Sequence, residues 1–426
     1  MREMKDSGIE WIGQIPTNWD VVPHKRVMHK VKEICEQYNG EDIISLTMNG
    51  VIKRDLTAGG KMPTSFDGYQ YVKPNDLLLC LFDIDVTPRC VGVVKDYGVT
   101  SPAYSRFVIH DGYYNAYYDY LLRAIDDDKV FVHLSKNLRS SLTENDFGAI
   151  KTCVPPLAEQ ERIAAFLDAQ CAEIDAVLEK TRASIEEYKK LKQAVITQAV
   201  TKGIRGDRPM KDSGIEWIGD IPAEWNKDKV IRVFSVIGSG TTPKSSDENL
   251  FDGNTPWIQS GDINGENLFV TKNCVSNSAI ESYSALRVYQ APYLVVAMYG
   301  ASVGNLSLSM IDACVNQACC VLKKPTINLK FSFYIFKAVK DYLARKAVGG
   351  GQPNISQETI KQLWLPIPSA DEQIEISNCL DEKCRSVDAL IAKKQQYLTE
   401  IENYKKSLIY EYVTGKKEVK TSVLAD

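Results

Sequence analysis

The sequence is poor in histidine and has no phosphate-binding loop. Its four histidines are His24, His29, His110 and His133, so the chain beyond residue 133 contains none. A histidine-based mechanism or metal site repeated along the whole chain is therefore excluded. The pattern Gly-x-x-x-x-Gly-Lys-Ser/Thr is also absent, which argues against an ATP-driven motor.

Disulfide and membrane signals are missing as well. The eleven cysteines form no Cys-x-x-Cys pair, and we interpret them as reduced thiols rather than zinc ligands or disulfide partners. No apolar run reaches the length of a membrane span, and the first residues lack a signal-peptide core, so we expect a cytoplasmic protein. The cysteines at apolar positions are Cys80, Cys171, Cys314, Cys319 and Cys320.

The composition is that of a globular protein without a large excess of either charge. With 426 residues, 44% hydrophobic and 25% charged, the chain is long enough for two or more domains with substantial cores. Its net charge of −4 does not indicate a nucleic-acid-binding protein by itself. A nucleic-acid-binding surface would have to be a local basic face, offset by acidic residues elsewhere.

A short segment near the start of the chain recurs in its middle. Met4–Gly13 is repeated letter for letter as Met210–Gly219, and the match extends through Trp19 and Trp225. Four of the six tryptophans lie in these two segments, which indicates packing rather than chemistry. We predict that each segment ties the start of one domain to a long helix, and that the chain is an internal duplication.

Two long helices are predicted over Glu159–Val200 and Glu372–Val413. In both, apolar residues recur at alternating spacings of three and four, which is the heptad pattern of a coiled coil. Each helix would be roughly 60 Å long. The alternative is a helix of an ordinary bundle, but the matched copies favour an intramolecular coiled coil. The predicted seam contains Leu167, Ile174, Leu178, Ile185, Tyr188 and Val195 in the first helix, and Leu380, Val387, Ile391, Leu398, Ile401 and Leu408 in the second.

The seam has polar interruptions at matched places. They are Thr181 and Lys192 in the first helix and Lys394 and Lys405 in the second, each pair of positions 213 residues apart. Lysines at seam positions can specify the register of two helices at some expense in stability.

Each long helix follows a body of mixed structure. In both bodies short β-like runs alternate with Gly, Pro, Asn and Asp turns and precede a helical stretch, as at Asp76–Phe82 and Tyr113–Ala124. The fold class is therefore α+β, with a pseudo-two-fold internal repeat. The predicted boundaries are 1–154 for the first domain, 155–205 for the first long helix, 206–365 for the second domain and 366–420 for the second long helix.

No catalytic centre is apparent in the sequence. Gly300–Gly304 has only part of a nucleotide-binding turn, and Val154–Leu157 lacks the polar and aromatic residues of an adenine methyltransferase motif. Asp83 and Asp85 could ligate a metal, but a solvated loop end is the simpler interpretation. The chain is therefore predicted not to be an enzyme.

Polar loops in both bodies offer groups suited to DNA. Arg and Lys bind phosphates and guanine edges, whereas Gln and Asn carry the paired donor and acceptor that recognise adenine. Glycine-rich loops additionally let backbone amides approach a ligand closely. The alternative is that these are surface turns; the matched position of two loops in the two bodies favours binding. The candidate DNA-binding residues are Lys53, Arg54, Lys136, Asn137, Arg139, Thr241, Lys244, Gln352 and Asn354.

These features resemble a known family. The segment Lys5–Gly13 and the helix start Pro155–Ile163 are similar to those of the DNA-specificity (S) subunits of type I restriction–modification systems. The likeness covers nearly the whole chain and is weakest inside the two bodies. Pro366-Ile367-Pro368 departs slightly from the family's Pro-Pro pattern but keeps the start of the second helix.

The resemblance implies two target-recognition domains separated by an antiparallel pair of conserved helices. Each domain would read one half of a bipartite, asymmetric site in double-stranded DNA. Two methyltransferase (M) subunits would dock on the helices, and restriction (R) subunits would join for cleavage. S-adenosylmethionine, ATP and Mg would be bound by these partners, with no cofactor on this chain. The alternative function is a coiled-coil assembly scaffold whose two domains bind proteins.

Overall fold

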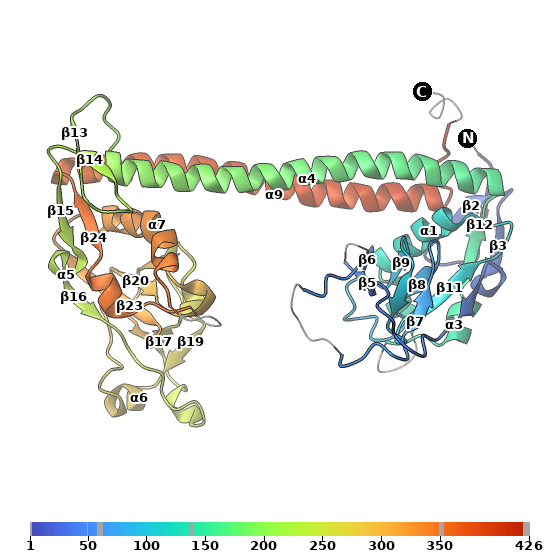
Figure 1. The fold of residues 1–426 in the computed structure, drawn as a ribbon, viewed down its shortest axis with the longest axis horizontal. Helices are drawn as coiled ribbons and strands as arrows, with labels where there is room; N and C mark the ends of the chain where they lie inside the picture. Colours follow the sequence, from blue (N-terminus) through green and yellow to red (C-terminus); the bar gives the residue numbers. More distant parts are fainter. Residues whose placement is uncertain (1, 49, 58–62, 136–139, 349–352, 421–426) are drawn as a thin grey trace. The chain divides into compact units, whose positions relative to one another are not determined.

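A computed structural model describes residues 2–48, 50–57, 63–135, 140–348 and 353–420 (Figure 1). The chain divides into two compact units. The first unit is Met1–Arg182 with Gln396–Asp426, and the second unit is Ala183–Gln395. Each unit contains a globular part, which we call its head, and a portion of both long helices.

The first head is built from short strands around one central sheet. Its two-stranded pairs are β1 (Met4–Asp6) with β2 (Gln14–Pro16), β3 (Asp20–Pro23) with β12 (Lys151–Val154), β5 (Ile44–Thr47) with β6 (Gly50–Lys53), and β7 (Gln70–Val72) with β10 (Gly98–Thr100). The central sheet has the order β4 (Met28–Val31), β11 (Ser105–Ile109), β8 (Leu77–Leu79), β9 (Val91–Val93). The helices are η1 (His24–Arg26), α1 (Asn115–Asp127), α2 (Val130–Leu134) and α3 (Glu144–Ala149).

The second head has the same central sheet with a larger elaboration. Its central sheet has the order β16 (Phe234–Gly238), β23 (Cys319–Pro325), β20 (Tyr293–Ala297), β21 (Leu306–Ser309), β18 (Asn267–Leu268). The other sheets are β13 (Met210–Asp212) with β14 (Asp220–Pro222), β15 (Asn226–Lys229) with β24 (Trp364–Ile367), and β19 (Asn273–Val275), β17 (Thr255–Ile258), β22 (Cys314–Val315). The helices are α5 (Val230–Val233), η2 (Glu248–Leu250), η3 (Ser260–Asp262), α6 (Asn277–Ser282), η4 (Gly300–Ser302), α7 (Leu329–Arg345) and α8 (Gln357–Lys361).

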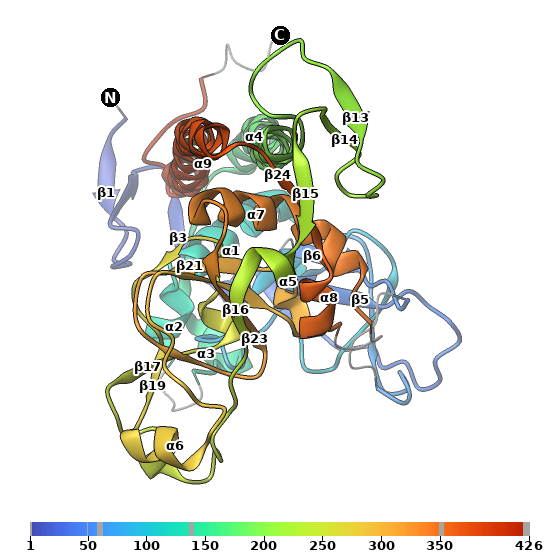
Figure 2. The same ribbon diagram turned by 90° about the vertical axis from the view of Figure 1, so that its left-hand side faces the viewer.

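The central strand of each sheet is apolar along its whole length. All three residues of β8 and all five of β20 are buried, as expected for a strand covered on both faces. In each head the chain then forms a helix, α1 or α7, and α7 lies between its sheet and the long helices (Figure 2). The side chain of Asn328 caps α7 by accepting hydrogen bonds from the amides of Lys330 and Phe331. The predicted α+β duplication is confirmed.

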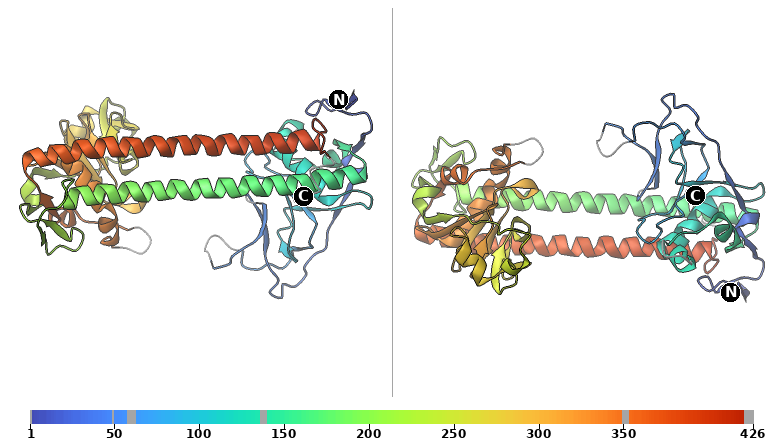
Figure 3. Two further views of the ribbon diagram at one scale, coloured as in Figure 1. Left: turned by 90° about the horizontal axis from the view of Figure 1, so that it is seen from above. Right: turned by 90° about the horizontal axis from the view of Figure 1, so that it is seen from below.

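The long helices are α4 (Leu157–Lys202) and α9 (Ala370–Val413). In the first unit Lys405 bonds Asp175 and Arg182 bonds Glu402; in the second unit Lys192 bonds Asp388. In the first unit Asp175 pairs with Lys405 and, further along α4, Arg182 pairs with the earlier residue Glu402 of α9. These segments therefore run antiparallel. The segments lie side by side in both views of Figure 3.

Every predicted seam residue is buried or half-buried, and its place in the contact between the helices stays a prediction. The buried members are Leu167, Leu178, Ile185, Leu380 and Leu408, and the half-buried members are Ile174, Tyr188, Val195, Val387, Ile391, Leu398 and Ile401. The four polar seam residues also find partners. Thr181 donates to the carbonyl of Val177, and the ammonium of Lys394 lies over the ring of Tyr188. The two remaining lysines form the ion pairs with Asp175 and Asp388.

The predicted cysteine state agrees with the structure. All eleven cysteines are free, and those predicted in apolar positions are buried. No described helix is long and apolar enough to cross a membrane. Within the described residues, no group of three or more His, Cys, Asp and Glu side chains is arranged to hold a metal ion.

Candidate nucleic-acid interface

In the first unit, a buried carboxylate at the start of α4 holds the N-terminal segment. Glu159 Oε2 accepts a 3.1 Å hydrogen bond from Trp19 Nε1 and a 2.7 Å bond from Arg2. Trp19 is fully buried and Glu159 is 6% exposed, so each satisfies a polar group that water does not reach. The predicted tie between the tryptophan segment and the long helix is confirmed here.

The second unit repeats this contact at the start of α9. Glu372 accepts a 2.8 Å hydrogen bond from Trp225 Nε1 and a 2.6 Å bond from Arg208. The sequence analysis missed the glutamate and arginine partners, although Arg2 and Arg208 have the same spacing as the two tryptophans. A capping box of Ser369 and Glu372 fits the sequence. Here the Glu372 amide donates to the Ser369 hydroxyl, whereas the carboxylate is engaged by Trp225 and Arg208.

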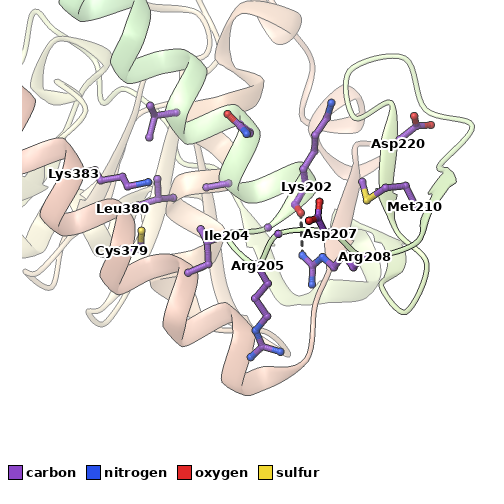
Figure 4. Close-up of a pocket in the computed structure, with 15 residues that line it drawn as sticks. Lys202, Ile204, Arg205, Asp207, Arg208, Met210, Asp220, Cys379, Leu380 and Lys383 are labelled. Carbon is purple, nitrogen blue, oxygen red and sulfur yellow. Dashed lines mark hydrogen bonds between the residues drawn. The ribbon is translucent and has the colours of Figure 1, made fainter.

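The segment of residues 203–208, which follows α4, positions Arg208 beside α9. A hollow of about 500 Å³ lies where the end of α4, residues 203–208 and α9 meet, and Figure 4 shows the residues that line it. Arg208 reaches back to the carbonyl of Lys202 at 2.9 Å. Gly203 has a φ of +76°, and a Cβ atom there would lie 1.8 Å from the Arg208 guanidinium. Glycine is therefore required at this point for the chain to turn and for Arg208 to reach Glu372.

The residue after each buried glutamate makes a second contact with its head. Gln160 donates to the carbonyl of Pro155 at 2.8 Å and accepts from the amide of Tyr114 at 2.8 Å. Gln373 donates to Pro368 at 2.9 Å and accepts from the amide that precedes α7 at 2.6 Å. The side-chain amide thus joins each long helix to the loop before the head's own helix.

A third contact joins the head helices directly to the long helices. Tyr120 of α1 donates to Asp168 at 2.7 Å, and Tyr334 of α7 donates to Asp381 at 2.6 Å. Burial and the neighbouring carboxylate raise the pKa of both phenols above their usual range, so both remain protonated donors. The three repeated contacts fix each head on its portion of the helices by the same chemistry.

The candidate DNA-binding residues of the first head lie partly in one hairpin. Lys53 ends β6, is 58% exposed at its side chain and pairs with Asp42 at 2.6 Å. Arg54 is half-buried, and its amide donates to the carbonyl of Ile43. Lys136, Asn137 and Arg139 lie outside the described residues. The described members of the predicted set in this head, Lys53 and Arg54, are adjacent at the end of β6.

The glycine-rich loop of the second head is organised by packing. A Cβ at Gly238 would lie 2.1 Å from the Tyr289 hydroxyl, and one at Gly240 would lie 1.7 Å from the Val315 carbonyl. These two glycines therefore allow close packing of the protein on itself, which differs from the predicted role in approaching a ligand. Thr241 is half-buried, and Lys244 is exposed at the end of the loop.

Asn354 lies at the base of the other predicted loop. Its amide and carbonyl form two hydrogen bonds with Val348, of 3.0 and 2.9 Å, and Gly300 donates to the carbonyl of Pro353 at 2.8 Å. Gln352 lies outside the described residues. Asn354 itself is exposed, and it pairs as a bridge with Tyr299. The backbone around Asn354 is therefore fixed while its side chain stays accessible.

Two exposed aromatic residues were missed by the sequence analysis. Phe82 is 39% exposed and Tyr299 is 45% exposed. Each follows the central strand of its head, β8 or β20. Their sequence signal is weak, because an aromatic residue at the end of an apolar strand is usually assigned to the core.

The chain was compared with known proteins. Residues 222–403 match the model of the type I restriction modification DNA specificity domain. The chain is 23% identical over 438 residues to a putative type I restriction enzyme MjaX specificity subunit of Methanocaldococcus jannaschii, with 96% of both chains covered. It is 25% identical over 285 residues to the MjaVIII specificity subunit of the same organism, with 64% of both chains covered.

The fold has a solved counterpart. A chain from a structure of a type I R-M system superposes with a TM-score of 0.71 at 16% identity, over 95% of this chain and 99% of the other. This likeness supports the fold. The matched domain and the relatives agree with the family resemblance drawn from the two repeated segments and the helix starts.

Proposed function

We propose that this chain is the DNA-specificity subunit of a type I restriction–modification system and works without catalytic groups of its own. The observation that carries this function is the duplicated frame. Two heads with the same central sheet are held on antiparallel helix segments by the same three contacts, through Glu159 or Glu372 and their neighbours. The same contacts therefore hold two heads whose surface loops differ.

Each head reads one half of a bipartite, asymmetric site in double-stranded DNA. The frame is repeated, but the loops on it differ, so the two heads present different donors and acceptors to base edges. The candidate contacts are Lys53, Arg54, Lys136, Asn137 and Arg139 in the first head and Thr241, Lys244, Gln352 and Asn354 in the second.

Two methyltransferase subunits dock on the helices. Exposed apolar residues support this, because they recur at equivalent positions 213 residues apart: Val177 with Leu390, and Leu191 with Tyr404. Each unit presents one such residue from α4 and one from α9. A partner that docks on the helices would bury the apolar area of these side chains.

The remaining parts of the system would be supplied by partners. S-adenosylmethionine would be bound by the methyltransferase subunits, and ATP and Mg would be bound by partner subunits as well. Restriction subunits would join for cleavage. The complex would act in the cytoplasm, where it meets the DNA.

A direct test is the methylation pattern of a host that carries this chain with its methyltransferase partner. We expect methylated adenine at one bipartite sequence, and no methyl transfer or cleavage by the purified chain alone. Lys244→Ala and Asn354→Ala should alter only the half-site that the second head reads. Specific binding should weaken as salt rises, because phosphate contacts release counterions. Methyl transfer by the isolated chain, or absence of DNA binding by the complex, would refute the proposal and favour a protein-binding scaffold.

A further inference from the structure

Phe82 and Tyr299 occupy the same place in the two heads. The carbonyl just before each aromatic residue accepts a hydrogen bond from a returning segment: Leu81 from the amide of Leu142 at 2.8 Å, and Met298 from the amide of Ile355 at 2.9 Å. Both returning segments then enter a short helix, α3 or α8. The two aromatic residues are therefore equivalent in the fold.

The backbone after each aromatic residue makes the same turn. Asp83 has a φ of +47° and Gly300 has a φ of +71°, both in the left-handed region. The residue at the turn differs, and Gly and Asp are both residue types that adopt left-handed backbone. The left-handed residue directly after each ring helps to set the direction in which the chain leaves it.

The surroundings of Phe82 fit a nucleic acid base. The ring lines a groove of about 300 Å³ together with Met48, Arg89 and Tyr104. Burial raises the pKa of the Tyr104 phenol, and the positive charge of Arg54 opposes this rise. Arg89 donates to the carbonyl of Met48 at 3.1 Å and pairs with Asp127 at 3.5 Å, which holds its guanidinium beside the groove.

Tyr299 has a comparable neighbour in the second head. It pairs as a bridge with Asn354, whose side chain is exposed. The hydrogen bond from Gly300 to Pro353 holds the two segments together. An exposed aromatic ring and an adenine-recognising side-chain type are thus adjacent in the second head, as a ring and a cation are in the first.

We propose that Phe82 and Tyr299 are specificity-determining residues, each making an apolar or stacking contact with a base in the half-site of its head. This inference rests on the proposed function and adds residues to it. A neutral ring gains little from a phosphate, but it gains from the thymine methyl group or a base face. The recurrence of an exposed ring at one place in two otherwise divergent heads is the observation that supports it.

The test uses the complex of this chain with its methyltransferase partner. The parent, Phe82→Ala and Tyr299→Ala are titrated with the parent's DNA site, with every single-base change in each half, and with unrelated duplex at several salt concentrations. Matched controls are Tyr97→Ala and Phe269→Ala, which remove rings that are 52% and 65% exposed elsewhere in the same heads. Phe82→Tyr and Tyr299→Phe keep the ring.

We expect each alanine variant to lose about tenfold in affinity for the parent's site and to relax one base position in one half only. Binding to unrelated duplex and its salt dependence should not change, and the ring-keeping and control variants should behave like the parent. If an alanine variant does not fold, Phe82→Leu or Tyr299→Leu, which shorten the reach of the side chain, should show the same change.

Two results would overturn the inference while leaving the proposed function intact. One is that the parent complex discriminates between DNA sequences and the alanine variants discriminate equally well. The other is an equal loss of affinity for all DNA, which indicates a phosphate contact or damage to the head. A parent complex without any sequence preference would refute the proposed function itself, and this inference with it.

Discussion

His24 in the first head and Val230 in the second occupy the same place in the fold. Each follows the strand that pairs with the last strand of its head, and each donates its amide to a carbonyl 2.9 Å away, of Ile150 or Leu363. Both side chains are fully buried. One is an imidazole and the other is a hydrocarbon, so the frame is kept by the backbone bonds and by burial rather than by side-chain identity.

The heads differ most in the segment between their first and central sheet strands. In the first head this segment forms β5, β6 and β7, whereas in the second it forms β17, β18, β19 and α6. The strand order around the central strand is nevertheless the same. The contacts with the long helices are therefore repeated in the two heads, whereas the segments between these strands differ.

The largest loss of stability is expected when the buried carboxylate of one unit is removed. Glu372→Ala should lower the free energy of unfolding of the second unit by about 3 kcal/mol, because Trp225 and Arg208 lose a shared buried acceptor, although Arg208 keeps its contact with Glu224. Glu159→Ala should have an effect of similar size on the first unit, since Arg2 is more exposed than Arg208, 21% against 11%, whereas Arg208 keeps Glu224. Urea unfolding followed by tryptophan fluorescence measures both.

The control for this pair is Glu375→Ala. It removes an exposed ion pair with Arg205 one turn along α9 and should leave stability nearly unchanged. Equal effects of Glu372→Ala and Glu375→Ala would show that the buried contact does not hold the head.

Because Val230 stands in the second head where the first head has His24, only the first unit should lose stability in mild acid through this position. Burial lowers the pKa of His24 from 6.5 to about 4, so the unfolded chain takes up a proton first as the pH falls between these values. The first unit should lose about 3 kcal/mol of stability through this group over that window. His24→Val, which installs the residue type of the second head, should flatten the dependence.

Thermal melting of parent and variant at steps from pH 7 to pH 4 checks this, read as the difference between the two. His133→Gln removes an exposed histidine and should keep the slope of the parent. A parental slope in the His24→Val variant would contradict the expectation.

The tyrosine contacts with the long helices should contribute differently to the stability of the two units. Tyr120→Phe removes a hydrogen bond to the carboxylate of Asp168 and should lower stability by about 2 kcal/mol. Tyr334→Phe should have about half that effect, because Asp381 keeps its contact with Lys330. Unfolding midpoints of both variants, with exposed Tyr397→Phe as the control, measure the difference. The reverse order of the two effects would count against this assignment.

The smallest effect is expected at the repeated ion pairs of the helices. Lys405→Met and Lys192→Met should each lower stability by about 0.2–1 kcal/mol, because Asp175 and Asp388 are largely exposed. Exchanging the two charges, as Lys192→Asp with Asp388→Lys, should recover most of the loss. Failure of the exchange to recover stability would mean that the lysine stem, rather than its charge, contributes.

The sequence predicted well what depends on local periodicity. The heptad spacing put Leu167, Leu178 and Leu408 on the apolar side of the long helices, and all three are buried, because side-chain direction in a helix follows directly from residue number. The repeated tryptophan segment similarly predicted the tie to the long helices. The sequence could not identify Glu159 as the partner of Trp19, since that contact joins residues 140 positions apart.

The candidate site was less predictable. Lys53 and Arg54 were chosen by residue type, and the structure adds their neighbours Asp42 and Ile43. Gly238 and Gly240 fit a ligand loop in the sequence, yet their missing side chains make room for Tyr289 and Val315. Composition does not reveal which atoms a loop will approach.

The sequence alone predicts the duplication and the two long helices, because repeats and heptads can be read residue by residue along the chain. The exposure of Phe82 and Tyr299 at equivalent places became visible only in the tertiary structure. So did the burial of His24 where Val230 lies in the other head. These properties depend on hydrogen bonds between distant segments, such as those from Leu142 to Leu81 and from Ile355 to Met298. Exposure is set by what the rest of the chain covers, and no local pattern contains that information.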